Sequence, residues 1–155
     1  MFKRMLLSTG AGAALVLAAC ENPVERPDCT PMFNTLKETR GDTVVTTTGL
    51  RYIETTAGTG ETVVSCRGAA VSLRGTFLDG SEFQPSVGYR FTPGLHQLVA
   101  GFEQGVIGMR VGGTRRVIVP PELAYGTVDV KDNAGKVVIP ANSTVVFDIG
   151  ALAVE

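Results

Sequence analysis

The segment from Gly101 to Asp148 contains three distinctive sequence motifs, here called phrases: Gly101-Phe102-Glu103-Gln104-Gly105, then Val119-Pro-Pro-Glu-Leu-Ala-Tyr-Gly126, and then Ile139-Pro-Ala-Asn-Ser-Thr-Val-Val-Phe-Asp148. Apolar residues at helical spacing around the first phrase predict a helix, and its glycines keep that helix short. The paired prolines of the second phrase end a strand because proline lacks the backbone donor. The third phrase leads into a strand, in which Val145, Phe147 and Ile149 occupy one face.

Working outward, the clearest strand pattern is Ala69 to Leu78, where apolar residues alternate with Ser72, Arg74 and Thr76. The dipeptide Asp79-Gly80 then predicts a turn. Residues rich in β-branched and aromatic side chains predict further strands at Thr43–Thr48, Leu50–Glu54, Val111–Val119 and Thr144–Ala151. Many strands with one short helix predict an α+β domain, in which an antiparallel sheet curls round the helix and exposes its other face to water.

Together with Gly49-Leu-Arg-Tyr52, Gly58-Thr-Gly60 and Leu78-Asp-Gly-Ser-Glu-Phe83, these phrases resemble the FKBP-type peptidyl-prolyl isomerases over roughly residues 49 to 154. The resemblance implies an FKBP-like curled antiparallel β-sheet wrapped round one short α-helix. It also implies peptidyl-prolyl cis-trans isomerase activity that requires no cofactor.

By motif, the resemblance implies a substrate pocket and gives three residues a direct role. The Tyr125 hydroxyl would donate to the carbonyl of the residue before proline, the Val99 main-chain N–H would bind a substrate carbonyl farther along, and Phe102 would form the floor. The other expected pocket residues are Leu73, Phe83, Gln84, Tyr89, Phe91, Leu98, Ile139 and Phe147. The alternative is that the aromatic residues serve only as core, which is the usual meaning of such a pattern.

The sequence departs from the family pattern at two pocket positions and in two loops. Leu73 replaces a tyrosine and Gln84 replaces an aspartate, so the pocket loses a hydroxyl and a carboxylate. The chain is shorter between Phe83 and Tyr89, and it is longer before Ile139, where residues 129–135 are expected to form a polar loop over the site. Because tacrolimus- and rapamycin-like macrolides use the aspartate position, any binding of them is expected to be weak.

Two other functions stay open beside the isomerase, and the departures at Leu73 and Gln84 bear on the first of them. One is a non-catalytic chaperone or peptide-binding module with the same fold. The other is a lipoprotein that serves only as a structural interaction domain in an envelope complex. An aromatic pocket beside a proline-rich loop favours the isomerase over the structural domain, but it does not separate the isomerase from the binding module.

Residues 1–19 have the pattern of a lipoprotein signal peptide, with Lys3, Arg4, an apolar run and then Leu17-Ala18-Ala19-Cys20. Cleavage would leave Cys20 as an acylated N-terminus. Residues 20–42 are expected to be a lipidated tether without a fold of its own, and residues 43–155 the isomerase domain. The implied location is the bacterial cell envelope, and Glu21 favours the periplasmic face of the outer membrane. The expected partners are proline-containing unfolded or nascent envelope polypeptides, with membrane attachment through the lipid alone.

Composition limits the remaining functions. Loss of Lys3 and Arg4 reduces 14 basic residues to 12, against 15 acidic ones, so the processed chain carries a formal charge of −3 and suggests no nucleic-acid partner. Cys29 and Cys66 form either a disulfide, which an oxidising envelope favours, or two separate thiols. Because His96 is the only histidine and the cysteines lack close pairing, no metal site is expected.

Overall fold

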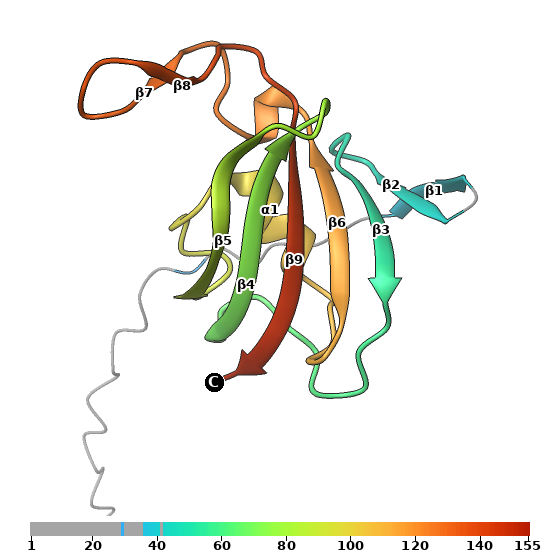
Figure 1. Ribbon diagram of the computed structural model, residues 1–155. Coiled ribbons are helices and arrows are strands. Elements are labelled where there is room, and N and C mark those ends of the chain that lie inside the picture. The colour runs from blue at the N-terminus through green and yellow to red at the C-terminus, as the bar shows by residue number, and fades with distance from the viewer. Residues whose placement is uncertain (1–28, 30–35, 41) are drawn as a thin grey trace, which may run out of the picture.

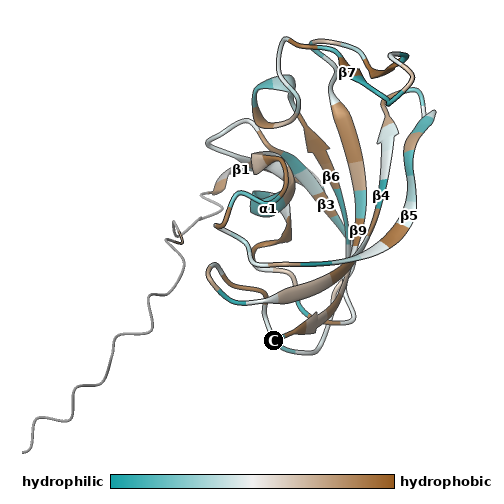
Figure 2. Ribbon diagram, turned by 90° about the vertical axis from the view of Figure 1, so that its left-hand side faces the viewer, coloured by the Kyte–Doolittle hydropathy of each residue, from teal (hydrophilic) through white to brown (hydrophobic). Residues whose placement is uncertain are grey.

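The computed structural model describes Cys29, residues 36–40 and residues 42–155. Seven antiparallel strands form a curled sheet, in the order β1-β2-β3-β6-β9-β4-β5, and β7 and β8 form a separate hairpin (Figure 1). The helix α1 lies against the inner side of the sheet (Figure 2). The bounds are β1 Leu36–Arg40, β2 Thr43–Thr46, β3 Arg51–Thr56, β4 Ala69–Phe77, β5 Glu82–Phe91, α1 Ala100–Val106, β6 Thr114–Val119, η1 Pro121–Leu123, β7 Val130–Lys131, β8 Val137–Ile139 and β9 Val145–Val154. The predicted α+β fold is confirmed.

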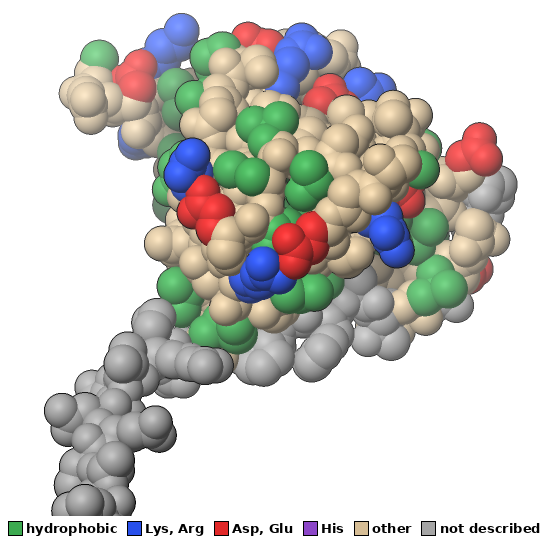
Figure 3. All heavy atoms as spheres, turned by 90° about the horizontal axis from the view of Figure 1, so that it is seen from below, with side chains coloured by type: hydrophobic (Ala, Val, Ile, Leu, Met, Phe, Trp, Pro, Cys, Tyr) green, Lys and Arg blue, Asp and Glu red, His purple; other side chains and the backbone are tan. Residues whose placement is uncertain are grey.

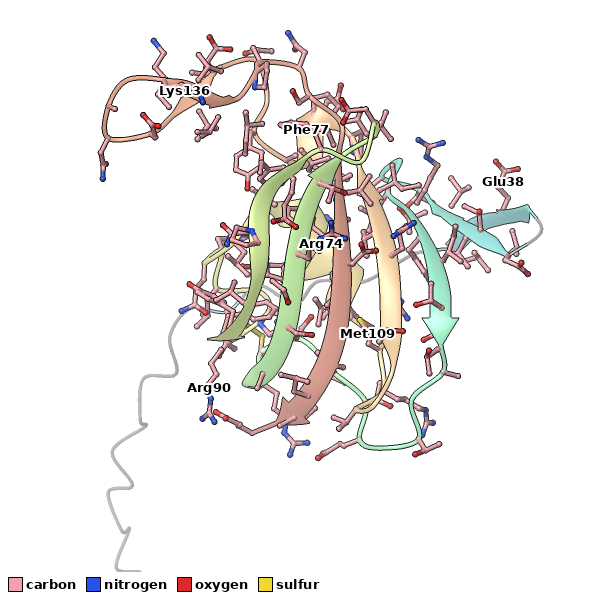
Figure 4. All side chains as sticks on the ribbon, in the orientation of Figure 1. Glu38, Arg74, Phe77, Arg90, Met109 and Lys136 are labelled. Atoms are coloured by element: carbon pink, nitrogen blue, oxygen red, sulfur yellow. A yellow bond between two sulfur atoms is a disulfide. The ribbon has the colours of Figure 1, made fainter. Side chains whose placement is uncertain are left out.

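Strands β4 and β9 pair along their whole lengths and carry much of the core. Leu73 pairs with Ile149, and Gly75 pairs with Phe147. The alternation predicted for both strands is confirmed, since Leu73, Phe147 and Ile149 are each at most 8% exposed. On the outer face, Arg116 pairs with Asp148 at 2.7 Å, and Arg74 (Figure 4) pairs with Glu82 at 2.6 Å. One face of the sheet is therefore apolar and the other carries ion pairs.

Two glycines allow α1 to approach the sheet directly. A Cβ on Gly101 would lie 2.2 Å from Cγ1 of Val119, and a Cβ on Gly105 would lie 2.9 Å from Cγ1 of Val117. At the end of the helix, the buried guanidinium of Arg115 donates to the carbonyl oxygens of Gly105, at 2.8 Å, and Ile107, at 3.0 Å. A cation at this end also complements the helix dipole. The glycines of this motif thus set the packing of the helix as well as its length.

Strands β5, β7 and β8 lie where the sequence analysis predicts no strand. Strand β5 was not predicted because it is an edge strand, contains Pro85 and exposes most of its residues, so the alternation is hidden. Strand β7 lies in the segment 129–135 that was expected to be a polar loop, and β8 follows that segment. The turn between them is closed by Asp132, whose Oδ1 accepts the N–H groups of Ala134 and Lys136 at 2.9 and 3.0 Å.

Strand β1 corrects the expected domain boundary. Leu36–Arg40 lies inside the region expected to be tether, but it pairs antiparallel with β2, with Thr39 opposite Val44. The expectation that residues 20–42 have no fold of their own is therefore wrong for β1. The predicted signal peptide, the acylation site Cys20 and residues 21–28 lie outside the described residues. In the part of the chain that is described, no helix has the length and apolar character needed to cross a membrane.

Cys29 and Cys66 are joined by a disulfide, with a Cα–Cα distance of 5.7 Å. The bond attaches the N-terminal segment to the connection between β3 and β4. The main-chain N–H of Cys66 donates to the carbonyl of Pro93 at 2.8 Å. Pro93 lies two residues beyond the end of β5, so the disulfide is next to the loop that leads into α1.

Candidate active site

A pocket of about 600 Å³ lies between β5, the loop before α1 and the segment after η1. Strands β4 and β9 and the helix itself contribute to its base. The residues that line it are Leu73, Phe83, Gln84, Val87, Tyr89, Gln97, Leu98, Val99, Phe102, Tyr125 and Phe147. Nine of these eleven residues belong to the predicted set, so the fold brings together side chains that are far apart in the sequence.

Three phenylalanines form the base of the pocket. The rings of Phe102 and Phe147 meet edge to face, with centroids 5.2 Å apart, and Phe83 meets Phe147 in the same way at 6.0 Å. Phe102 is 1% exposed and Phe147 is 4% exposed, so they serve as core and as pocket surface together. Gly75 makes room for Phe83, because a Cβ at this position would lie 2.6 Å from the phenylalanine ring.

Tyr125 extends the aromatic surface from the segment after η1. Its ring meets Phe83 edge to face at 6.3 Å. A tight turn holds the segment, since the N–H of Gly126 donates to Pro121 and the N–H of Asn142 donates to Gly126. Burial raises the pKa of the Tyr125 hydroxyl above its ordinary value of 10.0. The hydroxyl is therefore a neutral donor at physiological pH, and among the described residues it has no hydrogen-bond partner.

The loop before α1 supplies Gln97, Leu98 and Val99. The carbonyl of Val99 accepts the N–H groups of Phe102 and Glu103 at 2.9 and 3.2 Å, which starts the helix. The N–H of Val99 has no partner within the described part of the chain. The loop thus presents a main-chain donor beside the pocket.

The side chain of Glu103 holds this loop in place through hydrogen bonds. It is fully buried, its Oε2 accepts the N–H of Gly94 at 2.8 Å, and its Oε1 accepts the N–H of Leu98 at 3.0 Å. A buried carboxylate is stable when such donors satisfy it. Glu103 does not line the pocket, but it determines where Leu98 and Val99 lie. Glu103 belongs to the motif Gly101–Gly105, but its role could not be predicted, because an isolated glutamate in a sequence gives no sign of burial.

Two predicted pocket residues lie behind the lining. Phe91 is 4% exposed and its ring packs against Phe102 at 5.7 Å. Ile139 is also buried, in β8, and belongs to the core. The expected polar loop over the site is wrong, because residues 126–139 contribute nothing to the lining. The hairpin that they form projects beyond the end of the sheet (Figure 1).

Val87 and Gln97 line the pocket without having been predicted. For Val87 the one available signal is its spacing, since it shares one face of β5 with Tyr89 and Phe91, but the exposure of this edge strand obscures that pattern. Gln97 has none, because loop residues follow no periodicity. Its side-chain oxygen accepts the N–H of Thr92 at 2.8 Å and so closes the loop on itself.

The two departures from the family pattern both lie at the pocket. Leu73 is 8% exposed, and Gln84 donates from Nε2 to the carbonyl of Pro85 at 3.2 Å. Among the described residues, those that line the pocket include no charged side chain. In the same part of the chain no cluster of three metal-ligating side chains occurs. The chemistry available here is therefore apolar contact and neutral hydrogen bonding.

A concave, largely apolar pocket of this volume with a few convergent polar groups is typical of a binding site for a small molecule or an extended peptide. The fold and pocket together define a class in which a curled sheet and a short helix enclose an aromatic binding site. The FKBP-type peptidyl-prolyl cis-trans isomerase family matches residues 55–152. The chain belongs to this family.

Individual relatives agree with the assignment. FKBP-type peptidyl-prolyl cis-trans isomerase FkpA of Escherichia coli (strain K12) is 37% identical over 110 residues, which are 70% of this chain and 38% of FkpA. FK506-binding protein 4 of Chaetomium thermophilum is 45% identical over 103 residues, or 63% of this chain and 20% of that protein. The chain therefore spans well under half the length of these relatives.

Solved structures have the same fold. The crystal structure of FkpA from Escherichia coli superposes with a TM-score of 0.60 and 32% identity, covering 76% of this chain and 53% of that one. The crystal structure of AtFKBP13 gives a TM-score of 0.65 and 27% identity, covering 72% of this chain and 97% of that one. The FKBP-like curled sheet that the sequence predicts is confirmed.

Proposed function

We propose that this chain is a peptidyl-prolyl cis-trans isomerase that assists the folding of envelope proteins and is tethered to the membrane through a lipidated Cys20. The observation that carries the proposal is the aromatic pocket with the Tyr125 hydroxyl in its wall and no charged side chain in its lining. Membership of the FKBP-type family supports the same activity.

The reaction needs no nucleophile, acid or metal. Rotation about an X-Pro bond must break amide resonance, with a barrier of about 18 to 20 kcal/mol. The planar amide is more dipolar than the twisted one, so an apolar pocket that excludes water disfavours the ground state relative to the transition state. Each tenfold acceleration needs about 1.4 kcal/mol of this difference. Phe102, Phe147 and Phe83 supply such surroundings for the proline ring.

Two neutral donors orient the substrate. The Tyr125 hydroxyl donates to the carbonyl of the residue before proline, and its raised pKa keeps its proton in place. The Val99 N–H binds a substrate carbonyl farther along the peptide. Neither group transfers a proton. Together they hold the chain on both sides of the rotating bond, so rotation within the pocket needs little movement of the flanking residues.

The proposed clients are unfolded or nascent envelope polypeptides that contain proline. The signal-peptide pattern of residues 1–19 and the acylation motif ending at Cys20 support the location in the bacterial envelope, on the periplasmic face of the outer membrane. The Cys29–Cys66 disulfide is compatible with an oxidising compartment. Tacrolimus- and rapamycin-like macrolides are proposed as weak ligands, since the relative from Chaetomium thermophilum is named for binding FK506 but Gln84 lacks a carboxylate here.

A non-catalytic peptide-binding module is the second candidate. Leu73 and Gln84 favour it, because both lie in the lining and both lack the polar groups of the family pattern. The two functions differ in turnover, not in binding. Catalysis by the pocket described above rests on its apolar base and on Tyr125, which are retained, so the isomerase is the better supported candidate.

The deciding experiment is a protease-free isomerisation assay on X-Pro peptides, using soluble protein from Asp28 onward. Uncatalysed isomerisation takes about 10 to 100 s, so acceleration is measured directly against the blank. Concentration-dependent acceleration supports the isomerase. Saturable peptide binding without acceleration would replace it with the binding module.

A further inference from the structure

The disulfide joins the N-terminal segment to the domain beside the pocket. Cys66 is exposed, and its N–H is held by the carbonyl of Pro93 at 2.8 Å. Pro93 is followed by Gly94, and Glu103 binds the N–H groups of both Gly94 and Leu98. Cys29 therefore sits at the start of the same loop that forms one wall of the pocket. We call β5 together with residues 92–99 the pocket edge of the domain.

Without the disulfide, β1 would be the first described segment through which the N-terminal part of the chain is attached to the domain. This strand lies at the other end of the sheet from β5, as the strand order requires and Figure 1 shows. Seven residues separate Cys29 from Leu36, so the two points of attachment lie at most about 25 Å apart. The disulfide thus moves the point where the chain leaves the domain from β1 to a position beside the loop that follows β5.

The covalent distance to Cys20 also changes. Cys29 is nine residues from Cys20, whereas Leu36 is sixteen residues from it. A fully extended chain spans at most about 3.5 Å per residue, so the limits are about 30 Å for Cys29 and about 55 Å for Leu36. An anchored Cys20 therefore cannot be farther than about 30 Å from Cys29, which is bonded beside Pro93 of the pocket edge.

The surface charge near the disulfide is compatible with a position close to a membrane. Arg67 pairs with Glu61, and Arg90 pairs with Glu155 at 2.7 Å. Figure 3 looks at this end of the molecule and shows basic and acidic side chains next to one another. A surface of balanced charge is not repelled by anionic lipid headgroups, as a strongly acidic surface would be.

We propose that the Cys29–Cys66 disulfide holds the pocket edge of the domain toward the membrane, so that the site acts on polypeptide segments close to the lipid surface. The inference rests on the proposed acylation of Cys20. Loss of the disulfide, as on replacement of both cysteines, transfers the attachment to β1, releases the pocket edge and lengthens the reach of the site. The disulfide thereby selects clients by their distance from the membrane and leaves the chemistry of the pocket unchanged.

The test measures energy transfer from the protein to the membrane. The full chain, processed in a bacterial envelope, is reconstituted in phosphatidylethanolamine and phosphatidylglycerol vesicles with an acceptor dye on the headgroups. A donor dye is attached through a bio-orthogonal amino acid at His96, on the pocket edge, or at Asp42, beside β1; both positions are exposed. Non-reducing peptide mapping verifies the Cys29–Cys66 pair in each sample.

In the disulfide-bonded protein, transfer is expected to be stronger from position 96 than from position 42. In the double variant Cys29→Ser with Cys66→Ser, this difference is expected to be lost or reversed. Insertion of twelve Gly and Ser residues after Pro23 keeps the disulfide and should weaken transfer from both positions while preserving their order. That second variant keeps the test valid if the serine variant folds poorly.

The same order of transfer in the disulfide-bonded and serine proteins would overturn the inference, as would stronger transfer from position 42 in the bonded protein. Recovery of the processed chain in solution with unmodified Cys20 would overturn both the lipid anchor and the inference. Isomerisation of X-Pro peptides by the same samples reports the proposed activity separately. Loss of that activity with the expected order of transfer would leave the orientation standing.

Discussion

The carboxylate of Glu103 accepts the main-chain N–H of Leu98 at 3.0 Å, and neither oxygen of this carboxylate reaches solvent. Its other oxygen accepts the N–H of Gly94 at 2.8 Å. The helix that places Phe102 in the base of the pocket thus also fixes the loop that places Val99 in its wall. Two parts of the candidate site are held in place by one buried side chain that does not itself line the pocket.

We expect Glu103→Gln to loosen this wall. An amide has one oxygen, so either Gly94 or Leu98 loses its acceptor and faces an NH₂ group instead. A buried donor without a partner costs about 1 to 3 kcal/mol. The free energy of unfolding should fall by this amount, and KM for an X-Pro peptide should rise more than kcat falls, because Val99 is displaced from the substrate.

Urea unfolding and the peptide assay measure the two effects of Glu103→Gln. The matched control is Glu122→Gln, since Glu122 is exposed on η1. The control is expected to change stability by no more than about 0.5 kcal/mol. If both variants behaved like the parent protein, the carboxylate of Glu103 would not be positioning the loop.

We expect Gly101→Ala to destabilise the domain even though alanine favours helices by about 1 kcal/mol. The new Cβ would lie 2.2 Å from Cγ1 of Val119, so the helix must move away from β6. Overpacking of this kind costs about 1 to 3 kcal/mol or more. The measurement is the midpoint of urea unfolding at an unchanged m-value.

Gly88→Ala is the control for Gly101→Ala. Its Cβ would meet no atom within 4 Å, and Gly88 does not have the positive φ that favours glycine. The change should therefore be near neutral or slightly stabilising. Equal effects of the two substitutions would show that backbone freedom, and not the close approach of α1 to the sheet, explains Gly101.

The fold was largely predictable because its central strands obey simple alternation. In β4 and β9 every second residue packs inward, so the pattern is visible in the sequence. Strand β5 was not predicted because, at the edge of the sheet, it buries little and contains Pro85. Strand β1 was missed because Leu36–Arg40 is polar and gains its structure only by pairing with β2.

The site was predictable where a motif marks it. Phe102, Tyr125 and Phe147 belong to distinctive phrases, and all three line the pocket. Phe91 and Ile139 belong to the same pattern but lie one layer deeper, a difference in depth that alternation cannot reveal. Glu103 was missed as a positioning residue because its partners are main-chain groups, which leave no trace in the pattern of side chains.

We expect Tyr125→Phe to lower kcat/KM by a moderate factor while the protein remains folded. The change removes one hydrogen bond, with a net value of about 0.5 to 1.5 kcal/mol, and leaves the aromatic wall intact. This corresponds to a loss of roughly twofold to tenfold. Unchanged turnover in a folded variant would contradict the proposed hydrogen bond to the substrate carbonyl.

The raised pKa of Tyr125 predicts a specific pH dependence. Above the ordinary pKa of 10.0 the unfolded chain loses the phenolic proton, whereas the folded state still retains it. The contribution of Tyr125 to the free energy of unfolding is therefore fully present below pH 10 and decreases as the pH rises above that value. Turnover should accordingly stay constant between neutral pH and about 10 as far as this group is concerned. The check is a pH series of activity and stability, in which Tyr125→Phe should lack the alkaline component assigned to this hydroxyl.

Gln84→Asp should raise affinity for a tacrolimus-like macrolide more than it raises isomerisation of a peptide. Gln84 lines the pocket and its amide donates to Pro85, whereas a carboxylate there can accept a charge-assisted hydrogen bond from a ligand hydroxyl that a prolyl peptide lacks. Barrier lowering depends on the apolar base formed by Phe102 and Phe147, which the substitution does not alter.

Macrolide titration beside the peptide assay separates the macrolide affinity from the isomerisation rate. The control is Gln84→Asn, which changes the side-chain length without adding charge. If Gln84→Asp alone took turnover from undetectable to robust, Gln84 would mark a disabled enzyme, and the binding module would replace the isomerase as the function of the natural chain.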